Sequence, residues 1–181
     1  MKAQGQRGFT LIEVVVVAAI IAILAGILVP IIFKEIDEAR ITRAAADARS
    51  ISTAILIFRK DTGQWPVMDA NCNPTITLLT GDGKVPPNLA AMGYNAATTD
   101  LYDNHLSTNA NGCYNNWNGP YMAKVNADPW GNAYLTNADG FPMLNREIWV
   151  ISAGPNGVMD TPVPNLAGAS LIPDDVGLRL R

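Results

Sequence analysis

A single carboxylate, Glu13, carries the most unusual chemistry in this sequence, because it stands at the start of a long apolar run. Residues 14–33 contain no charged side chain, and a helix of about 20 residues spans the hydrocarbon core of a bilayer. A carboxylate near the bilayer centre costs about 2.5 kcal/mol or more, less near an interface, and usually marks a functional position. In a low dielectric it either takes up a proton or finds a cation. Glu13 therefore predicts either a protonated carboxyl group or a positively charged partner.

The elements that position Glu13 begin with a predicted transmembrane helix over residues 14–33. Backbone polar groups inside lipid must be satisfied within the segment, so this run has to be helical there. Lys2 and Arg7 precede it with no acid among them, which places the N-terminal side in the cytoplasm and the remainder outside the inner membrane. The run exceeds the apolar region of a cleaved secretory signal, and no small-residue cleavage pattern follows it. An ordinary single-pass anchor, with Glu13 reaching to lipid headgroups, stays open as an alternative.

An amphipathic half of the helix follows the apolar one. Pro30 lacks a backbone N–H and its ring clashes with the carbonyl group of Gly26, which predicts a kink or local opening. After Lys34, apolar residues recur in steps of three and four, the period of one helix face: Ile41, Ala44, Ala48, Ile51, Ile55 and Phe58. No glycine or proline interrupts the chain before Gly63, so we expect the helix to continue to about Thr62. This stripe predicts packing against a small sheet, although a coiled coil would use the same pattern.

Residues 69–118 are rich in Asn, Gly and Pro and are typical of a long loop, with one short helix or turn at residues 88–92. A loop of this length inside a compact domain needs a covalent or other constraint. Cys72 and Cys113 bracket the loop, and in an oxidising compartment they would pair. Two separate buried thiols are the alternative.

Two short β-prone pieces follow at residues 134–136 and 147–152, with a turn at residues 137–140 between them. They predict a small antiparallel sheet that lies on the amphipathic helix face. The expected fold class is therefore α+β. A long N-terminal helix, membrane-spanning in its first half and amphipathic in its second, would pack on a small antiparallel β-sheet with long loops.

Composition excludes several classes of function. The formal net charge of −3 and the sequence pI near 5.0 argue against a nucleic-acid binder, which needs a basic surface to neutralise phosphates. One histidine and two cysteines cannot supply a zinc site of three or four such ligands without carboxylates. The glycine motifs of phosphate and dinucleotide sites are missing from the sequence, as is H-E-x-x-H. We interpret His105, which has Asp100 and Asp103 nearby, as a surface histidine, and we expect no enzyme.

The segment Gly8-Phe9-Thr10-Leu11-Ile12-Glu13, after a short basic leader, resembles the N-terminus of the type IV pilin superfamily. The resemblance implies cleavage after Gly8 by a prepilin peptidase and N-methylation of the new terminus at Phe9. Cleavage would create an ammonium group one helical turn from Glu13. We hypothesise that Glu13 pairs with Phe9 of an adjacent subunit and so sets the register of a filament. In similar filaments the helix partly unwinds near Pro30, which lets helices pack along the core.

Three further stretches are similar to the major pseudopilins of type II secretion systems: residues 61–66, residues 119–121 with 128–134, and residues 152–157 with 174–177. This similarity implies a structural subunit of a pseudopilus that assembles from the inner membrane and helps move folded exoproteins through the outer-membrane secretin. The alternative is the major type IV pilin of a surface pilus for adhesion, motility or DNA uptake. A membrane-anchored enzyme or sensor that never polymerises is a third class of function.

The same resemblance implies the organisation and the partners of the chain. Residues 1–8 would be the cleaved leader, 9–33 the transmembrane and filament-core half of the helix, 34–62 its amphipathic half, and 63–181 a periplasmic globular domain. The protein would cross the inner membrane once and would form a periplasmic filament when assembled. Its partners would be copies of itself in a helical homopolymer, minor pseudopilins, the prepilin peptidase, the inner-membrane assembly platform, the secretin and the secreted proteins, and no nucleic acid.

The resemblance also implies one structural calcium ion in the last loop. Calcium takes six to eight oxygen ligands from carboxylates, amides and backbone carbonyls. The candidate ligands are the carbonyl groups of Ala153 and Val158 and the side chains of Asn156, Asp160, Asp174 and Asp175. Asn156 stands where the family has an aspartate, which lowers the ligand charge, and residues 160–173 form a long, proline-rich segment. A surface loop with solvated acids and no metal is the alternative.

Overall fold

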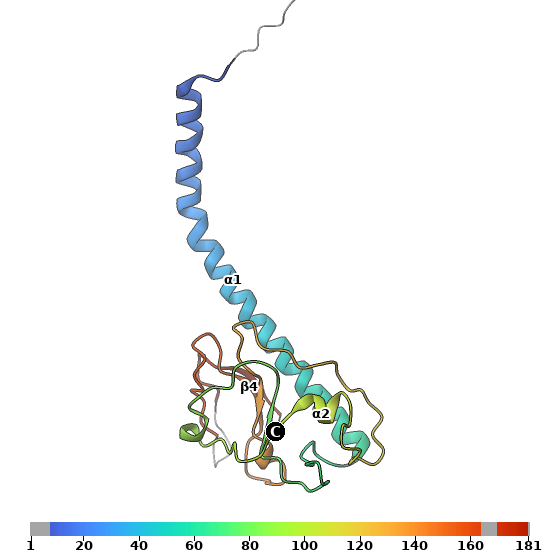
Figure 1. Cartoon of the computed structure of the whole chain (residues 1–181). Coiled ribbons are helices and arrows are strands. Elements are labelled where there is room, and N and C mark those ends of the chain that lie inside the picture. Colours follow the sequence, from blue (N-terminus) through green and yellow to red (C-terminus); the bar gives the residue numbers. More distant parts are fainter. Residues whose placement is uncertain (1–7, 164–169, 181) are drawn as a thin grey trace, which may run out of the picture. The chain divides into compact units, whose positions relative to one another are not determined.

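The computed structural model describes residues 8–163 and 170–180, and the chain divides into two compact units, Met1–Ala39 and Arg40–Arg181. The predicted leader lies outside the described residues except for Gly8. Helix α1 runs from Leu11 to Thr62 and so contributes to both units (Figure 1). Its end at Thr62 is the one predicted. The backbone stays helical through Pro30, so the proline ring removes one backbone hydrogen bond there without opening the helix.

In the first unit, residues 14–33 of α1 are uncharged and apolar on all sides, and their large side chains are exposed, as Ile23 shows with 66% of its surface accessible. By length and composition α1 is able to cross a membrane. A helix that is apolar around its whole circumference is stable only inside lipid or inside a bundle of protein. The first unit therefore presents a surface that another apolar phase has to cover.

The second unit contains a five-stranded sheet in the order β2-β1-β3-β4-β5, with β1 at Leu78–Thr80, β2 at Thr99–Leu101, β3 at Leu135–Thr136, β4 at Trp149–Ser152 and β5 at Val176–Arg179. The pairs β1–β3, β3–β4 and β4–β5 are antiparallel, and β1–β2 is parallel. The sheet is thus mixed, whereas an antiparallel sheet was predicted. A parallel pair needs a crossover, and the chain between β1 and β2 contains the short helix η1 at Leu89–Met92, where a helix or turn was expected.

Two further short helices complete the second unit: α2 at Tyr102–Leu106, directly after β2, and η2 at Ala138–Gly140, in the predicted turn between β3 and β4. The register between those strands pairs Leu135 with Ile151 and Thr136 with Val150. Both strands lie inside the ranges that the sequence predicted.

The core has two halves, because side chains along a strand alternate between the faces of the sheet. One half lies between the sheet and α1 and includes Phe58, Leu79 and Val150. The other half covers the opposite face and includes Leu78 and Ile151. Of the predicted helix stripe, the residues from Ala44 to Phe58 are buried: Ala44, Ala48, Ile51, Ile55 and Phe58. Ile41 is 45% exposed because it lies at the start of the second unit, ahead of the sheet contacts.

The predicted disulfide is present. Cys72 and Cys113 are joined with an S–S distance of 2.05 Å across 41 positions of sequence. The bond closes the loop region that contains β1, η1, β2 and α2. The alternative of two separate thiols is therefore wrong.

Candidate functional site

The N-terminal end of α1 holds the carboxylate that the sequence singled out. Oε2 of Glu13 accepts the backbone N–H of Thr10 at 2.8 Å and its hydroxyl group at 2.7 Å, while the Glu13 N–H points to Thr10 Oγ1 at 3.4 Å. This reciprocal arrangement is a capping box, which satisfies donors at the start of a helix. Within the described residues Oε1 of Glu13 accepts no hydrogen bond, so one oxygen is available to a partner.

The residues around Glu13 form an apolar, solvent-exposed end. Phe9 is 88% exposed and lies beside Glu13 in two shallow grooves, which are lined otherwise by Ile12, Val14, Val16, Val17, Ala18 and Ile21. Gly8 lies in non-helical chain just ahead of the helix, and a Cβ atom at Gly8 would meet nothing within 4 Å. The packing of the described residues therefore does not require glycine at position 8.

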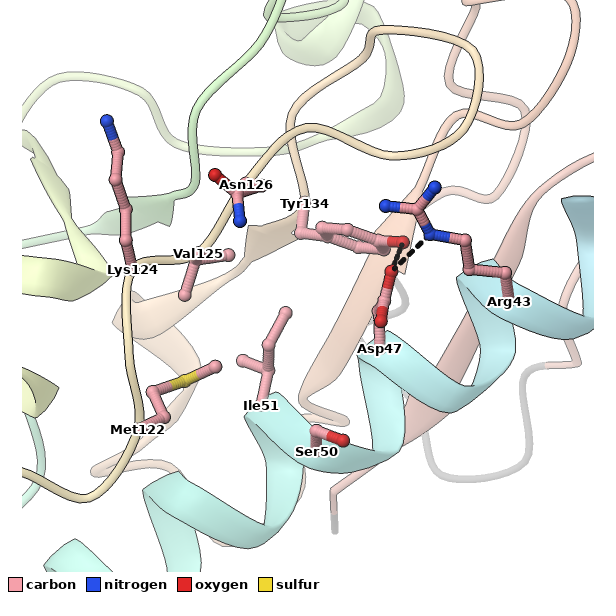
Figure 2. A pocket seen from close by; sticks show the side chains of 9 residues that line it. All are labelled: Arg43, Asp47, Ser50, Ile51, Met122, Lys124, Val125, Asn126 and Tyr134. Atoms are coloured by element: carbon pink, nitrogen blue, oxygen red, sulfur yellow. Dashed lines mark hydrogen bonds and ion pairs between the residues drawn. The ribbon is translucent and has the colours of Figure 1, made fainter.

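A polar contact joins α1 to the sheet within the second unit. Figure 2 shows Arg43 and Asp47 on α1 facing Tyr134, the residue before β3. These side chains line a hollow of about 110 Å³. The Tyr134 hydroxyl donates to Asp47 Oδ2 at 3.2 Å, and Arg43 Nε lies 3.7 Å from the same oxygen. Burial, with the negative charge of Asp47, raises the pKa of the Tyr134 hydroxyl. The hollow is too small for an organic substrate. The contact of Asp47 with Tyr134 and Arg43 instead helps to hold the helix in position against the sheet.

The segment 128–134, which is similar to pseudopilins, has a structural role here. Asp128 Oδ1 accepts the backbone N–H groups of Trp130 at 2.9 Å and Asn132 at 2.7 Å, and Asp128 Oδ2 bonds the hydroxyl of Ser152. Asn132 in turn donates from Nδ2 to the carbonyl oxygen of Gly154 at 2.8 Å. The segment thus connects the turn before β3 to the loop after β4.

That loop brings three of the predicted calcium ligands together. Asn156 donates from Nδ2 to Asp160 Oδ2 at 2.8 Å, and its Oδ1 accepts the N–H of Val158 at 2.7 Å. Asp175 Oδ2 accepts the N–H groups of Asp160, at 3.0 Å, and of Thr161. Hydrogen bonds among these polar groups therefore hold residues 156–161, and Asp160 and Asp175 lie close to one another.

Asp175 supplies the observation that fits a cation. Asp175 is 5% exposed, and its Oδ1 atom is buried with no hydrogen-bond partner. Burial, reinforced by the charge of Asp160, raises the pKa of Asp175. A cation bound to Oδ1 would remove both penalties. In the described part of the chain, however, no three His, Cys, Asp or Glu side chains gather as a metal cluster, so carbonyl and amide oxygens would have to complete the ligand set.

The other three predicted ligands are Ala153, Val158 and Asp174. The backbone of Asp174 packs on Gly154, where a Cβ atom would lie 2.0 Å from the Asp174 carbonyl oxygen. Ala153 is buried at the end of β4, and Val158 is at the surface of the loop. The structure thus brings Asn156, Asp160 and Asp175 together by side-chain contacts, and the role of all six residues as calcium ligands stays a prediction.

Sequence reasoning missed one polar group of the second unit. His105 is 1% exposed, so its interpretation as a surface histidine is wrong. Its ring contacts Asp100 and Tyr114, and the latter comes from the loop nine positions further along. The nearby Asp100 in the sequence was a signal for a partner, but no local pattern predicts the approach of Tyr114.

Comparison with known proteins identifies relatives of this chain. Residues 4–29 match the family described as "Prokaryotic N-terminal methylation motif", and residues 94–165 match "Type II secretion system (T2SS), protein G". The type II secretion system core protein G of Escherichia coli strain K12 is 30% identical over 157 residues, which cover 86% of each chain. The protein of the same name from Pseudomonas aeruginosa PAO1 is 28% identical over 141 residues, 77% of this chain and 79% of that one. The one from Klebsiella michiganensis is 27% identical over 161 residues, 89% and 92% of the two chains. No solved structure matches the chain.

Proposed function

Because the chain belongs to the family of the type II secretion system core protein G, we propose that it is the repeating structural subunit of a pseudopilus. The filament assembles from the inner membrane and helps move folded exoproteins through the outer-membrane secretin. The observation that carries this proposal is the first half of α1, which is apolar and exposed along its length and carries one carboxylate, Glu13, at its end. Copies of the same helix cover such a surface once it leaves the lipid.

Maturation prepares the helix end for this assembly. A prepilin peptidase cleaves after Gly8, and the new amino terminus at Phe9 is methylated. Support comes from the match of residues 4–29 to the methylation motif and from the position of Gly8 in exposed chain that its own packing does not constrain. The Phe9 ammonium of one subunit then pairs with Glu13 of the next, which uses the oxygen that the capping box leaves over.

In this proposal the second unit lies in the periplasm and has a structural rather than a catalytic role. Its disulfide suits an oxidising compartment. The basic leader stays in the cytoplasm, so the apolar half of α1 crosses the inner membrane once. The assembly platform, minor pseudopilins and the secretin act on the filament, and nucleic acid has no part in it.

A secretion assay tests the function. In the bacterium that carries this chain, deletion of its gene is expected to stop the release of the same folded proteins whose release stops when the secretin gene is deleted, and a plasmid copy is expected to restore it. Mass spectrometry of the mature protein is expected to show a chain that begins at Phe9 and is heavier by one methyl group. Loss of long, shearable surface fibres with secretion intact would instead identify a surface pilin. A mature chain that begins at Met1 would contradict both.

We also propose that the loop of Asn156, Asp160 and Asp175 binds one structural calcium ion, supported by the buried, unpartnered Oδ1 of Asp175. When bound, the ion neutralises the adjacent acids and stabilises the loop after β4. Calcium is expected to raise the melting temperature of the purified protein and a chelator to lower it, whereas the melting temperature of Asp175→Asn is expected to respond to neither. Magnesium serves as the matched control, because it demands a tighter octahedral site. A melting temperature that neither calcium nor chelator changes would refute the site.

A further inference from the structure

His105 is buried in a chain of polar side chains that the proposed filament function does not use. The ring belongs to α2, and both of its nitrogens face polar atoms. Nδ1 is 2.7 Å from the hydroxyl oxygen of Tyr114, and Nε2 is 3.2 Å from Oδ2 of Asp100. A buried polar ring of this kind has to be explained, because desolvation without compensation is costly.

The direction of the hydrogen bonds follows from the neighbours. The Tyr114 hydroxyl oxygen accepts the backbone N–H of Met68 at 3.0 Å, so its own proton points to Nδ1 of His105. The ring proton then sits on Nε2 and faces the carboxylate of Asp100. The other oxygen of Asp100 accepts the N–H of Leu101 at 2.8 Å and the amide of Asn104 at 2.6 Å, which fixes the carboxylate in place.

Charge supports the same arrangement. Burial alone would raise the pKa of Asp100, but the His105 ring and the two hydrogen bonds from Leu101 and Asn104 hold it below its usual value. Burial raises the pKa of Tyr114, so its hydroxyl keeps the proton that it donates. The Asp100–His105–Tyr114 chain is therefore a directed sequence of contacts that ends at the backbone of Met68.

The hydrogen bond between Met68 and Tyr114 joins the two segments that contain the cysteines. Tyr114 directly follows Cys113, and Met68 begins the turn that contains Cys72. Within this turn, Asp69 Oδ1 accepts the N–H groups of Asn71 and Asn73, at 2.8 and 2.9 Å. The N–H of Cys72 donates to the Asp69 carbonyl oxygen at 3.0 Å. Hydrogen bonds therefore connect the turn to the segment of Cys113 in addition to the S–S bond.

We propose that the Asp100–His105–Tyr114 chain positions Cys113 opposite Cys72 before the two are oxidised, and so promotes disulfide formation. In the oxidation, two thiols lose two protons and two electrons and form one S–S bond. An external disulfide, oxidised glutathione in the test below, takes them up and leaves as two thiols. Tyr114 and His105 are positioning residues in this step, since neither contacts the reacting sulfur atoms in the hydrogen bonds described.

The test is a thiol–disulfide equilibrium on the full chain in detergent. The reduced protein is equilibrated with defined ratios of reduced and oxidised glutathione, and the ratio of dithiol to disulfide protein gives the effective concentration of the two cysteines. Tyr114→Phe is expected to lower this concentration about tenfold, the effect of losing one hydrogen bond to a preordered segment. Asp100→Asn, which keeps its size but loses the charge that orients His105, is expected to lower it in the same direction.

Tyr121→Phe is the matched control. Tyr121 packs edge-on against Phe58 with ring centroids 5.5 Å apart, as Tyr114 does at 4.7 Å, and its hydroxyl accepts the N–H of Asn118 at 2.9 Å. The Tyr121 hydroxyl forms no hydrogen bond with the Cys72 turn, so the effective concentration of the two cysteines in Tyr121→Phe is expected to equal that in the wild type.

A purely structural role of Tyr114 would lower the melting temperatures of the oxidised and reduced forms equally and leave the thiol–disulfide equilibrium unchanged, and that result would overturn the proposal. An equal decrease in both tyrosine variants would overturn it too. Should Tyr114→Phe fail to fold, an unchanged equilibrium in Asp100→Asn would be decisive against it.

Discussion

Glu13 has two separable interactions, and a pair of substitutions distinguishes them. Its carboxylate caps its own helix through Thr10, and its charge is proposed to meet the Phe9 ammonium of a neighbouring subunit. Glu13→Gln keeps the cap, because glutamine serves in a capping box as glutamate does, but it removes the charge. Thr10→Ala removes the hydroxyl of the cap and keeps the charge.

The expected magnitudes differ widely. Loss of one partner from a desolvated ion pair leaves the other charge uncompensated, at a cost of about 3–5 kcal/mol per contact. This corresponds to a rise of roughly 10² to 10³-fold or more in the subunit concentration needed for assembly. Loss of a helix cap costs about 1 kcal/mol, which is a factor of roughly five. Glu13→Gln is therefore expected to stop filament formation, and Thr10→Ala to reduce it only slightly.

The assay compares the two variants in cells and in membranes. Overproduced filaments are sheared, pelleted and quantified against the membrane-bound pool, and carbonate extraction checks that each variant is inserted. Both variants are expected to insert and to be cleaved before Phe9. If Glu13→Gln assembled as well as the wild type while Thr10→Ala did not, helix capping would explain Glu13 and the pairing hypothesis would be refuted.

Three further predictions concern the second unit. Gly154→Ala is expected to destabilise the second unit by about 3 kcal/mol in a urea titration, because the residue has φ +62° and its Cβ would lie 2.0 Å from a backbone oxygen. Gly131→Ala is the control: its residue has φ +90° and its Cβ would meet no atom within 4 Å, so its cost is expected to be about half as large. Cys72→Ser is expected to cost about 4 kcal/mol by the chain-entropy relation for its loop, and urea midpoints that match those of the oxidised wild type would contradict this. Since burial raises the pKa of Asp175, the calcium-free protein is expected to lose stability as the pH rises above about 4, where this carboxyl ionises in the unfolded chain first. Asp175→Asn, measured by thermal melts across the pH range, should flatten that loss, and an unchanged pH profile would count against it.

The sequence was most informative where one periodicity extends over many residues. The apolar run and the three–four stripe predict the course of α1 to Thr62, because helix contacts repeat locally. The stripe residues that were expected to meet a sheet do so, apart from Ile41. β3 and β4 were predictable in the same way, since both are rich in β-prone residues around a recognisable turn.

Elements that depend on distant partners could not be predicted. β1, β2 and β5 have three or four residues each, and their pairing comes from segments far away in the sequence. The burial of His105 likewise depends on Tyr114, whose approach requires the loop to fold back. In the candidate calcium loop, the acids were identified by resemblance, but the Asn156–Asp160 hydrogen bond and the buried Oδ1 of Asp175 are properties of the folded chain alone.

The two halves of α1 impose different energetics on folding and on assembly. The second half packs on a sheet of its own chain, so the second unit gains its hydrophobic stabilisation before any filament exists. The first half gains little when it moves from lipid to a bundle, because lipid tails are as apolar as its own side chains. Close packing through small residues then has to favour the bundle, and this half offers Ala18, Ala19, Ala22, Ala25 and Gly26. Such packing tolerates several alignments of one helix along another, whereas a carboxylate in lipid has one acceptable position, beside a cation. In the proposed filament, Glu13 therefore decides the register of assembly, whereas apolar contacts supply most of the buried area between subunits.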